Sequence, residues 1–138
     1  MKQNKAVPRV NITIPVLNEE DTLESKISIL QSYIKKQLTN KASVSIVIAD
    51  NGSSDSTNKL GRKLALENDN IKFVETNNKG VGLALKESWL RHESNIMGYM
   101  DLDLATDLSH IEEAINMILF DKHKIVAGSR LMKESEVI

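Results

Sequence analysis

Cysteine is absent from the 138 residues of this sequence. Its absence excludes disulfides, thiolate zinc sites and thiol nucleophiles, and it is compatible with a reducing cytoplasm. Aromatic residues make up only 4% of the chain, which is too few for the stacking platform on which single-strand binders hold bases. We therefore expect an aliphatic core.

A strong charge of one sign is also missing. The formal net charge is -1, and both signs are interspersed, so no basic field attracts nucleic acid or an anionic membrane surface. No apolar run approaches the length of a membrane span, and residues 1–9 lack the apolar core of a signal peptide. These absences predict a cytoplasmic protein with no nucleic-acid partner.

The composition, with 41% hydrophobic and 27% charged residues, is that of an ordinary soluble protein. We expect a single domain over residues 1–138, because the chain shows no repeat and no linker. Short β-branched runs predict strands at residues 10–17, 44–49, 71–75, 96–100 and 125–127. Apolar residues at helical spacing predict helices within residues 23–38, 56–67, 81–89 and 108–118.

Alternating strands and helices predict an α/β fold. Parallel strands need crossover connections, so we expect a mostly parallel sheet with helices on both faces. Ligands of such sheets bind at the carboxyl ends of the strands. Four polar clusters follow predicted strands, at residues 15–19, 50–55, 101–103 and 129–130. The sequence therefore predicts one ligand site along this edge.

The segment Asp101-Leu102-Asp103 follows an apolar strand directly. Alternate residues of an extended segment project the same way, which brings two carboxylates within reach of one cation. Carboxylate oxygens suit Mg²⁺ or Mn²⁺, which also bind the phosphates of substrates. The alternative interpretation is a solvated loop or a helix cap. We favour the metal, because three other clusters share the edge.

The polar segment at residues 50–55 supports two interpretations, which stay open. Asp, Asn, Gly and Ser are the residues that a turn before a helix requires. Asp50 and Asn51 also leave a buried strand at the ligand edge. There a side-chain oxygen can accept a hydrogen bond from a nucleobase ring N–H, and an amide can donate to its carbonyl. We therefore count both among the candidate substrate-binding residues.

Five segments occur in a characteristic order: IPVLNEE at 14–20, IADNGSSD at 48–55, NKGVG at 78–82, DLDLATD at 101–107 and GSR at 128–130. Together they resemble the motifs of inverting family 2 glycosyltransferases, and within that family those of polyprenyl-phosphate (dolichyl-phosphate) mannosyl- and glucosyltransferases. The resemblance covers nearly all of the chain. It implies the GT-A (Rossmann-like) fold, a UDP- or GDP-sugar donor and a Mg²⁺ or Mn²⁺ cofactor.

The resemblance also implies a nucleoside pocket. Pro15, Leu17 and Glu19 would line it, and Ala49 and Asn51 would lie beside the base and ribose. Two positions depart from the commonest pattern. Leu17 stands where a tyrosine is frequent, and Asn51 stands where the second of two aspartates is usual. The identity of the base therefore stays open.

The reacting end of the donor is implied in the same way. Asp101, Leu102 and Asp103 would hold the ribose, metal and diphosphate, and Arg130 would contact the diphosphate or the sugar. A metal and an arginine stabilise the charge of the departing nucleoside diphosphate, so Asp103 and Arg130 are the catalytic candidates. A lipid-phosphate acceptor is already anionic and needs no strong general base, whereas a glycan hydroxyl would need one.

The resembling catalytic domains continue past their Gly-Ser-Arg strand into an acceptor-binding region. We therefore expect residues 1–138 to be the donor-binding part of a longer protein, with peripheral membrane association through a segment after Ile138. An uncovered sheet edge would favour a homo-oligomer.

Three alternatives remain. The first is a nucleotide-sugar-binding module without turnover. The second is a haloacid dehalogenase-like phosphotransferase with Asp101 as nucleophile, although Ala105 stands where that signature has threonine. The third is a dinucleotide-binding domain beginning at Gly80, in which Leu85 stands where a third glycine or alanine belongs.

Overall fold

The computed structural model describes residues 7–76, 80–92, 94–104 and 108–119. The chain forms two compact units, residues 1–105 and 106–138, and each is described by itself. The strand predicted at residues 125–127 and the candidate Arg130 lie outside the described residues.

The first unit alternates strands and helices as predicted. Its elements are β1 (Arg9–Val16), α1 (Leu23–Tyr33), the π-helical segment η1 (Ile34–Leu38), β2 (Ser43–Asp50), α2 (Thr57–Glu67), β3 (Ile71–Glu75), α3 (Val81–Arg91) and β4 (Ile96–Tyr99). The described part of the second unit is helix α4 (Ser109–Leu119), on which Ile115 is buried. No helix among the described residues is long and apolar enough to cross a membrane.

The four described strands form one parallel sheet in the order β3-β2-β1-β4. Strands β1 and β2 pair from Arg9 opposite Ser43 to Val16 opposite Asp50. Asp50 in turn lies opposite Glu75, the last residue of β3. The carboxyl ends of β1, β2 and β3 therefore share one edge, which confirms the predicted parallel arrangement.

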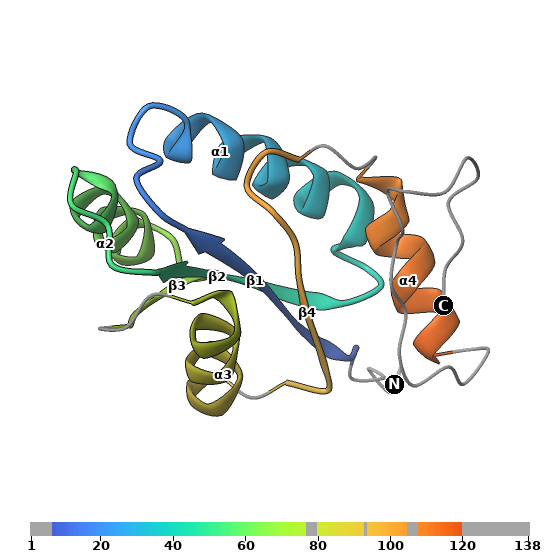
Figure 1. Cartoon of the computed structure of the whole chain (residues 1–138). Coiled ribbons are helices and arrows are strands. Elements are labelled where there is room, and N and C mark those ends of the chain that lie inside the picture. The colour runs from blue at the N-terminus through green and yellow to red at the C-terminus, as the bar shows by residue number, and fades with distance from the viewer. Residues whose placement is uncertain (1–6, 77–79, 93, 105–107, 120–138) are drawn as a thin grey trace, which may run out of the picture. The chain divides into compact units, whose positions relative to one another are not determined.

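Both faces of the central strands are buried, because helices cover the sheet on both sides. Figure 1 shows α1 and α2 on one side and α3 on the other. On the α3 side, Val47, Ala49 and Val74 form a buried cluster with Ala84 of the helix. On the other side, a Cβ at Gly61 of α2 would lie 3.5 Å from the Ile48 side chain. These aliphatic contacts form the core that the composition predicts.

The contact between β1 and α3 is polar. Asn11, Thr13 and Ser88 are fully buried. The Thr13 hydroxyl donates to Asn11 Oδ1 at 2.8 Å and lies 2.6 Å from Ser88 Oγ, while Asn11 Nδ2 donates to the carbonyl of His92 at 2.9 Å. Buried polar groups are costly unless hydrogen-bonded, so these bonds favour one register of α3 along β1.

Helix α1 carries the apolar stripe that its sequence predicts. Leu23, Ile27 and Leu30 are fully buried, and Ile34 and Leu38 continue the stripe through η1. The π-helical turn is the difference from prediction, since the spacing indicated one continuous α-helix. Lys35 lies in this wider turn, and its carbonyl accepts a hydrogen bond from the Thr39 hydroxyl at 2.6 Å.

Candidate functional site

Three polar loops leave the carboxyl edge of the first unit, after β1, β2 and β4. They correspond to three of the four polar clusters in the sequence. The fourth cluster, residues 129–130, lies outside the described part of the chain. The parallel register thus gathers the described candidates along one edge, as expected from the fold class.

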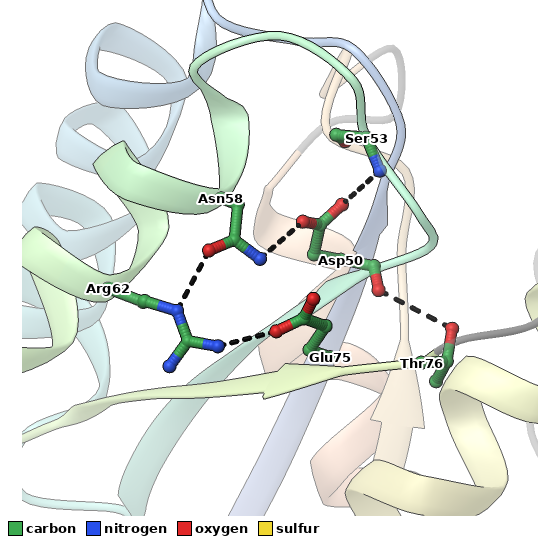
Figure 2. A network of polar contacts seen from close by, with 6 residues as sticks. All are labelled: Asp50, Ser53, Asn58, Arg62, Glu75 and Thr76. Carbon is green, nitrogen blue, oxygen red and sulfur yellow. Dashed lines mark hydrogen bonds and ion pairs between the residues drawn. The ribbon is translucent and has the colours of Figure 1, made fainter.

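Asp50 lies inside the loop after β2. Its side chain is only 1% exposed. One carboxylate oxygen accepts from the backbone N–H of Ser53 at 3.0 Å, and the other accepts from Nδ2 of Asn58 at 3.0 Å (Figure 2). Gly52, at φ 87°, supplies the left-handed backbone that this tight turn requires. Asp50 therefore holds the turn, and its contact with a base stays a prediction.

Asn51 connects the end of β2 to the start of α3. Its Oδ1 accepts from the backbone N–H of Gly80 at 2.8 Å and from the Thr76 hydroxyl at 3.3 Å. A backbone N–H can only donate, so the amide orientation is fixed with its oxygen toward Gly80. Both lone pairs of that oxygen are used. Any contact of Asn51 with a ligand therefore falls to Nδ2.

Asn18 joins the loop after β1 to the loop after β2. Its Oδ1 accepts from the backbone N–H groups of Ser54 at 2.8 Å and Asp55 at 3.3 Å. In return, the Asn18 backbone N–H donates to Ser53 Oγ at 2.9 Å. The residue adopts a φ of 52°, which asparagine tolerates better than most side chains.

Further bonds between the same loops run in both directions. The backbone N–H of Glu19 donates to Thr57 Oγ1 at 2.8 Å, and that of Glu20 donates to Asp55 Oδ2 at 3.3 Å. Glu20 Oε2 accepts from the backbone N–H of Ser56 at 2.9 Å. We call this arrangement of residues 18–20 with residues 53–57 the loop clasp. It fixes the backbone on which Glu19 is carried.

Asp55 belongs to the loop clasp, and the pKa of its carboxyl is shifted. Burial acts to raise its pKa, but hydrogen bonds from the hydroxyl and backbone N–H of Thr57 and from the backbone N–H of Glu20 outweigh that effect. The pKa of Asp55 therefore lies below its ordinary value. The clasp is thus built for the ionised carboxylate.

The candidate metal residues follow β4. Asp101 and Asp103 are exposed, whereas Leu102 between them is 5% exposed and anchors the segment in the core. The segment is a turn rather than extended, because the N–H of Leu104 donates to the carbonyl of Asp101 at 3.3 Å and Leu104 has a φ of 53°. The alternation of exposure nevertheless holds, since Asp101 and Asp103 are exposed and Leu102 is buried.

The chemistry of Asp101 and Asp103 fits Mg²⁺ or Mn²⁺, which take oxygen ligands. No group of three or more histidine, cysteine, aspartate or glutamate side chains that could hold a metal occurs within the described residues. Two carboxylates would leave most of the coordination sphere to water and to a ligand's phosphates. Such sharing is usual for Mg²⁺ sites that act on phosphates.

The remaining predicted residues differ in exposure. Leu17 is 40% exposed, and Pro15 and Glu19 are half-buried at the same edge. Ala49 is fully buried and belongs to the core cluster against α3. Its side chain therefore packs inside the protein, and a contact of Ala49 with the donor stays a prediction.

A polar network that the sequence did not predict runs from Asp50 through α2 to the end of β3. Arg62 Nε donates to Asn58 Oδ1 at 2.8 Å, and the Arg62 guanidinium pairs with Glu75 (Figure 2). The guanidinium also lies 4.8 Å from the ring centre of Phe73. Asn58 and Arg62 stand four residues apart on α2, so their contact could have been predicted from the helical spacing in the sequence. The partners on β2 and β3 required the tertiary structure.

A groove of the first unit lies away from these residues. It has a volume of about 570 Å³ and lies at the amino ends of the strands, where Ser43, Val44 and Asn70 line it together with Gln31 of α1. We place the candidate site at the opposite edge, because the loop clasp and both exposed aspartates gather there.

Comparison with known proteins gives a consistent result. The family model for Glycosyl transferase family 2 matches residues 11–137. The glycosyltransferase AglD of Haloferax volcanii is 28% identical over 126 residues, which are 91% of this chain and 20% of AglD. The dolichyl-phosphate beta-glucosyltransferase of Dictyostelium discoideum is 31% identical over 131 residues, or 88% of this chain and 39% of that protein. The chain thus spans well under half the length of these relatives.

Solved structures show the same fold. The mannosyltransferase PcManGT from Pyrobaculum calidifontis, in complex with GDP-Man and Mn²⁺, matches with a TM-score of 0.64 at 22% identity, covering 83% of this chain and 33% of that one. TarS of S. aureus, in complex with UDP, matches with a TM-score of 0.59 at 17% identity, covering 93% and 38%. These matches show that the chain has the GT-A fold.

Proposed function

This chain belongs to glycosyl transferase family 2, and we propose that its carboxyl sheet edge binds a nucleotide-sugar donor through a cation held at Asp101 and Asp103. The observation that carries the proposal is the pattern of exposure after β4. Asp101 and Asp103 are both exposed, and Leu102 between them is buried. A buried anchor between two ligands limits their motion and so favours a defined metal site.

The proposed cation is Mg²⁺ or Mn²⁺, and the donor is a UDP- or GDP-sugar. The presence of Mn²⁺ with GDP-Man in PcManGT and of UDP in TarS supports these classes. Pro15, Leu17 and Glu19 would line the nucleoside pocket. Asn51 would donate from Nδ2, and both uracil and guanine carry a carbonyl oxygen that accepts such a bond. The geometry at Asn51 therefore suits either base.

The proposed reaction transfers the sugar to an acceptor. The bond from the anomeric carbon to the donor's phosphate oxygen breaks as an acceptor oxygen bonds to that carbon. When bound, the cation supplies positive charge to the departing diphosphate. Asp101 and Asp103 hold it, and Arg130 contributes a second positive charge in our proposal.

For the acceptor we propose a polyprenyl phosphate, with a glycan hydroxyl as the alternative. The dolichyl-phosphate beta-glucosyltransferase relative supports the lipid phosphate. A phosphate oxygen attacks as an anion and needs no strong base from this chain. Contact with the membrane at the cytoplasmic face and self-association belong to the same proposal. The latter is supported by β4, which is the outermost described strand on its side of the sheet and has Tyr99 exposed.

Titration calorimetry tests donor binding. With Mn²⁺ present, UDP or GDP and the matching nucleotide sugars are expected to bind, and Asp103→Ala is expected to weaken binding at least about tenfold, which corresponds to about 1.4 kcal/mol. Asp69→Ala is the matched control, because Asp69 is an exposed acid just before β3, at the opposite end of the strands. Equal affinity in EDTA would contradict a bridging cation.

Sugar transfer is tested separately, with this chain and with a longer protein that contains it. We expect donor-dependent glycosylation of a polyprenyl phosphate by the longer protein. Donor binding without transfer by either would favour a binding module. Trapping of BeF₃⁻ on Asp101 would favour an aspartyl phosphotransferase instead.

A further inference from the structure

We propose that Asn58 is a positioning residue for the donor pocket, acting through Asp50 and the loop clasp. Asn58 lies in the first turn of α2 and is half-buried. Its amide bridges two charged groups, accepting from Arg62 Nε at 2.8 Å and donating to Asp50 Oδ2 at 3.0 Å. The inference rests on the proposed function, since it gives this bridge a role in donor binding.

The two neighbours dictate the chemistry at position 58. Arg62 Nε–H can only donate, and both carboxylate oxygens of Asp50 act as acceptors. The residue between them must present an acceptor on one side and a donor on the other, which is what an amide provides. Both contacts also fix which end of the amide is oxygen. A carboxylate at this position would satisfy Arg62 but would repel Asp50.

Contacts other than the one with Asn58 also hold Arg62 in place. Its guanidinium pairs with Glu75 at the end of β3 and lies 4.8 Å from the ring centre of Phe73. Asn58 thus contacts Asp50 of β2 and Arg62 of α2, and Arg62 in turn contacts Glu75 of β3 (Figure 2). The amide therefore sits between a fixed cation and a buried anion.

The hydrogen bonds continue from Asp50 into the pocket. Asp50 Oδ1 accepts from the N–H of Ser53, and Ser53 Oγ accepts from the N–H of Asn18. Asn18 lies between Leu17 and Glu19, which line the proposed nucleoside pocket. A continuous chain of hydrogen bonds thus leads from β3 to the loop after β1.

Loss of the Asn58 amide would leave one oxygen of a nearly fully buried carboxylate without its donor. The Asp50 side chain would then rotate toward another donor, because buried acceptors are costly when unpaired. That rotation would weaken the hydrogen bond from Ser53 to Asp50 and release Asn18. Asn58 is only half-buried, so we expect the effect to fall on the two loops rather than on the core.

Amide hydrogen exchange of the ligand-free chain tests the bridge itself. Asn58→Ala and Asn58→Asp are expected to exchange at least tenfold faster in residues 18–20 and 53–57, with β1 and β2 unchanged. Lys59→Ala is the matched control, since Lys59 is the exposed neighbour on the same helix, and it should leave these loops as protected as before. Unchanged loops, or equal loss of protection throughout the chain, would overturn the proposal.

The affinity for nucleotide, measured as a function of pH, tests the role of Asn58 in the proposed donor pocket. At pH 7 with Mn²⁺, both Asn58 variants should bind UDP or GDP at least tenfold more weakly than the unsubstituted chain. Between pH 7 and pH 5 the affinity of Asn58→Asp should recover toward that of the unsubstituted chain, because two adjacent carboxylates come to share a proton, which restores a donor to Asp50. Asn58→Ala has no such proton and should show no recovery.

The two experiments separate the two proposals. If the unsubstituted chain binds no nucleotide, the proposed function fails while the exchange result still decides whether Asn58 holds the loops. Two results with a chain that binds nucleotide would show that Asn58 has no positioning role. One is that the affinity of Asn58→Asp for nucleotide recovers between pH 7 and pH 5 no more than that of Asn58→Ala. The other is that neither substitution weakens nucleotide binding.

Discussion

At the scale of single residues, Asn18 combines two properties that few side chains share. It adopts a left-handed φ of 52°, and its Oδ1 accepts from two backbone N–H groups of the neighbouring loop, those of Ser54 and Asp55. Glycine would satisfy the first requirement and not the second. Alanine would satisfy neither.

This difference can be measured with two substitutions. Asn18→Gly should be destabilised by the lost acceptor, and Asn18→Ala should be less stable again by about 1 kcal/mol, because a left-handed φ is strained once a Cβ is present. Urea unfolding of both variants gives the two free energies. Equal stability of the alanine and glycine variants would show that the backbone at position 18 relaxes.

The Asp55 carboxylate predicts a pH dependence of stability. Its pKa is lowered in the folded state, so the ionised form stabilises the fold above the ordinary value of 3.8 and this contribution is lost as pH falls through the folded pKa. The stability advantage of the unsubstituted chain over Asp55→Asn should therefore shrink from pH 5 to pH 3. Unfolding curves that stay parallel over this range would contradict it.

At the scale of elements, α2 approaches β3 closely at one point. A Cβ at Gly61 would lie 2.6 Å from Cε1 of Phe73, and the Phe73 ring carries the Arg62 guanidinium on its face. The ring therefore cannot turn aside without disturbing that contact. The absence of a side chain at Gly61 lets α2 pack at this distance.

Gly61→Ala should lower the free energy of unfolding by about 1–3 kcal/mol, the usual cost of overpacking. Gly82→Ala is the control, because a Cβ at Gly82 in α3 would meet nothing within 4 Å. That variant should gain about 0.4–1 kcal/mol from the reduced freedom of its unfolded chain. Thermal or urea unfolding measures both, and a neutral Gly61→Ala would show that Phe73 moves freely.

The elements themselves were largely predictable from the sequence. The strand at residues 71–75 has its predicted bounds, because a run of β-branched and aromatic residues lies between turn-forming segments. The π-helical turn after Tyr33 was not predictable, since the apolar spacing continues unchanged through it. Ile34 and Leu38 are buried on both sides of this turn, as they would be in a continuous α-helix, so the apolar pattern does not distinguish the two forms.

The candidate site was predictable in position and less so in detail. Clusters after successive strands had to meet at one edge once the sheet was parallel, and the structure confirms that for the described ones. The use of each polar atom depended on partners distant in sequence. Asn51 is committed to Gly80, and Asp50 to Asn58. Residue type alone could not distinguish those contacts from contacts with a base.

At the scale of the whole molecule, the first unit contains every described candidate residue. A chain ending at residue 105 should therefore fold and bind Mn²⁺-nucleotide by itself. It should bind about tenfold or more weakly, because our proposal gives Arg130 a charged hydrogen bond to the diphosphate, a contact that contributes about 1.5–3 kcal/mol. Calorimetry on the shortened chain measures this.

Arg130→Ala in the chain of residues 1–138 is the matching control and should show the same loss. If the shortened chain binds as tightly as residues 1–138, Arg130 has no contact with the diphosphate. If only the shortened chain is weakened, another part of the second unit contributes instead.

The loop clasp also bears on the order of folding. Its bonds join segments about 35 residues apart, and each loop supplies acceptors for the backbone of the other. Neither loop can take its final shape until β1 and β2 have paired, because closing so long a segment costs entropy that the strands must first offset. The loop clasp at the carboxyl edge of the sheet should thus be among the last parts of the chain to fold. A newly collapsed chain would already have its central sheet but would not yet bind nucleotide.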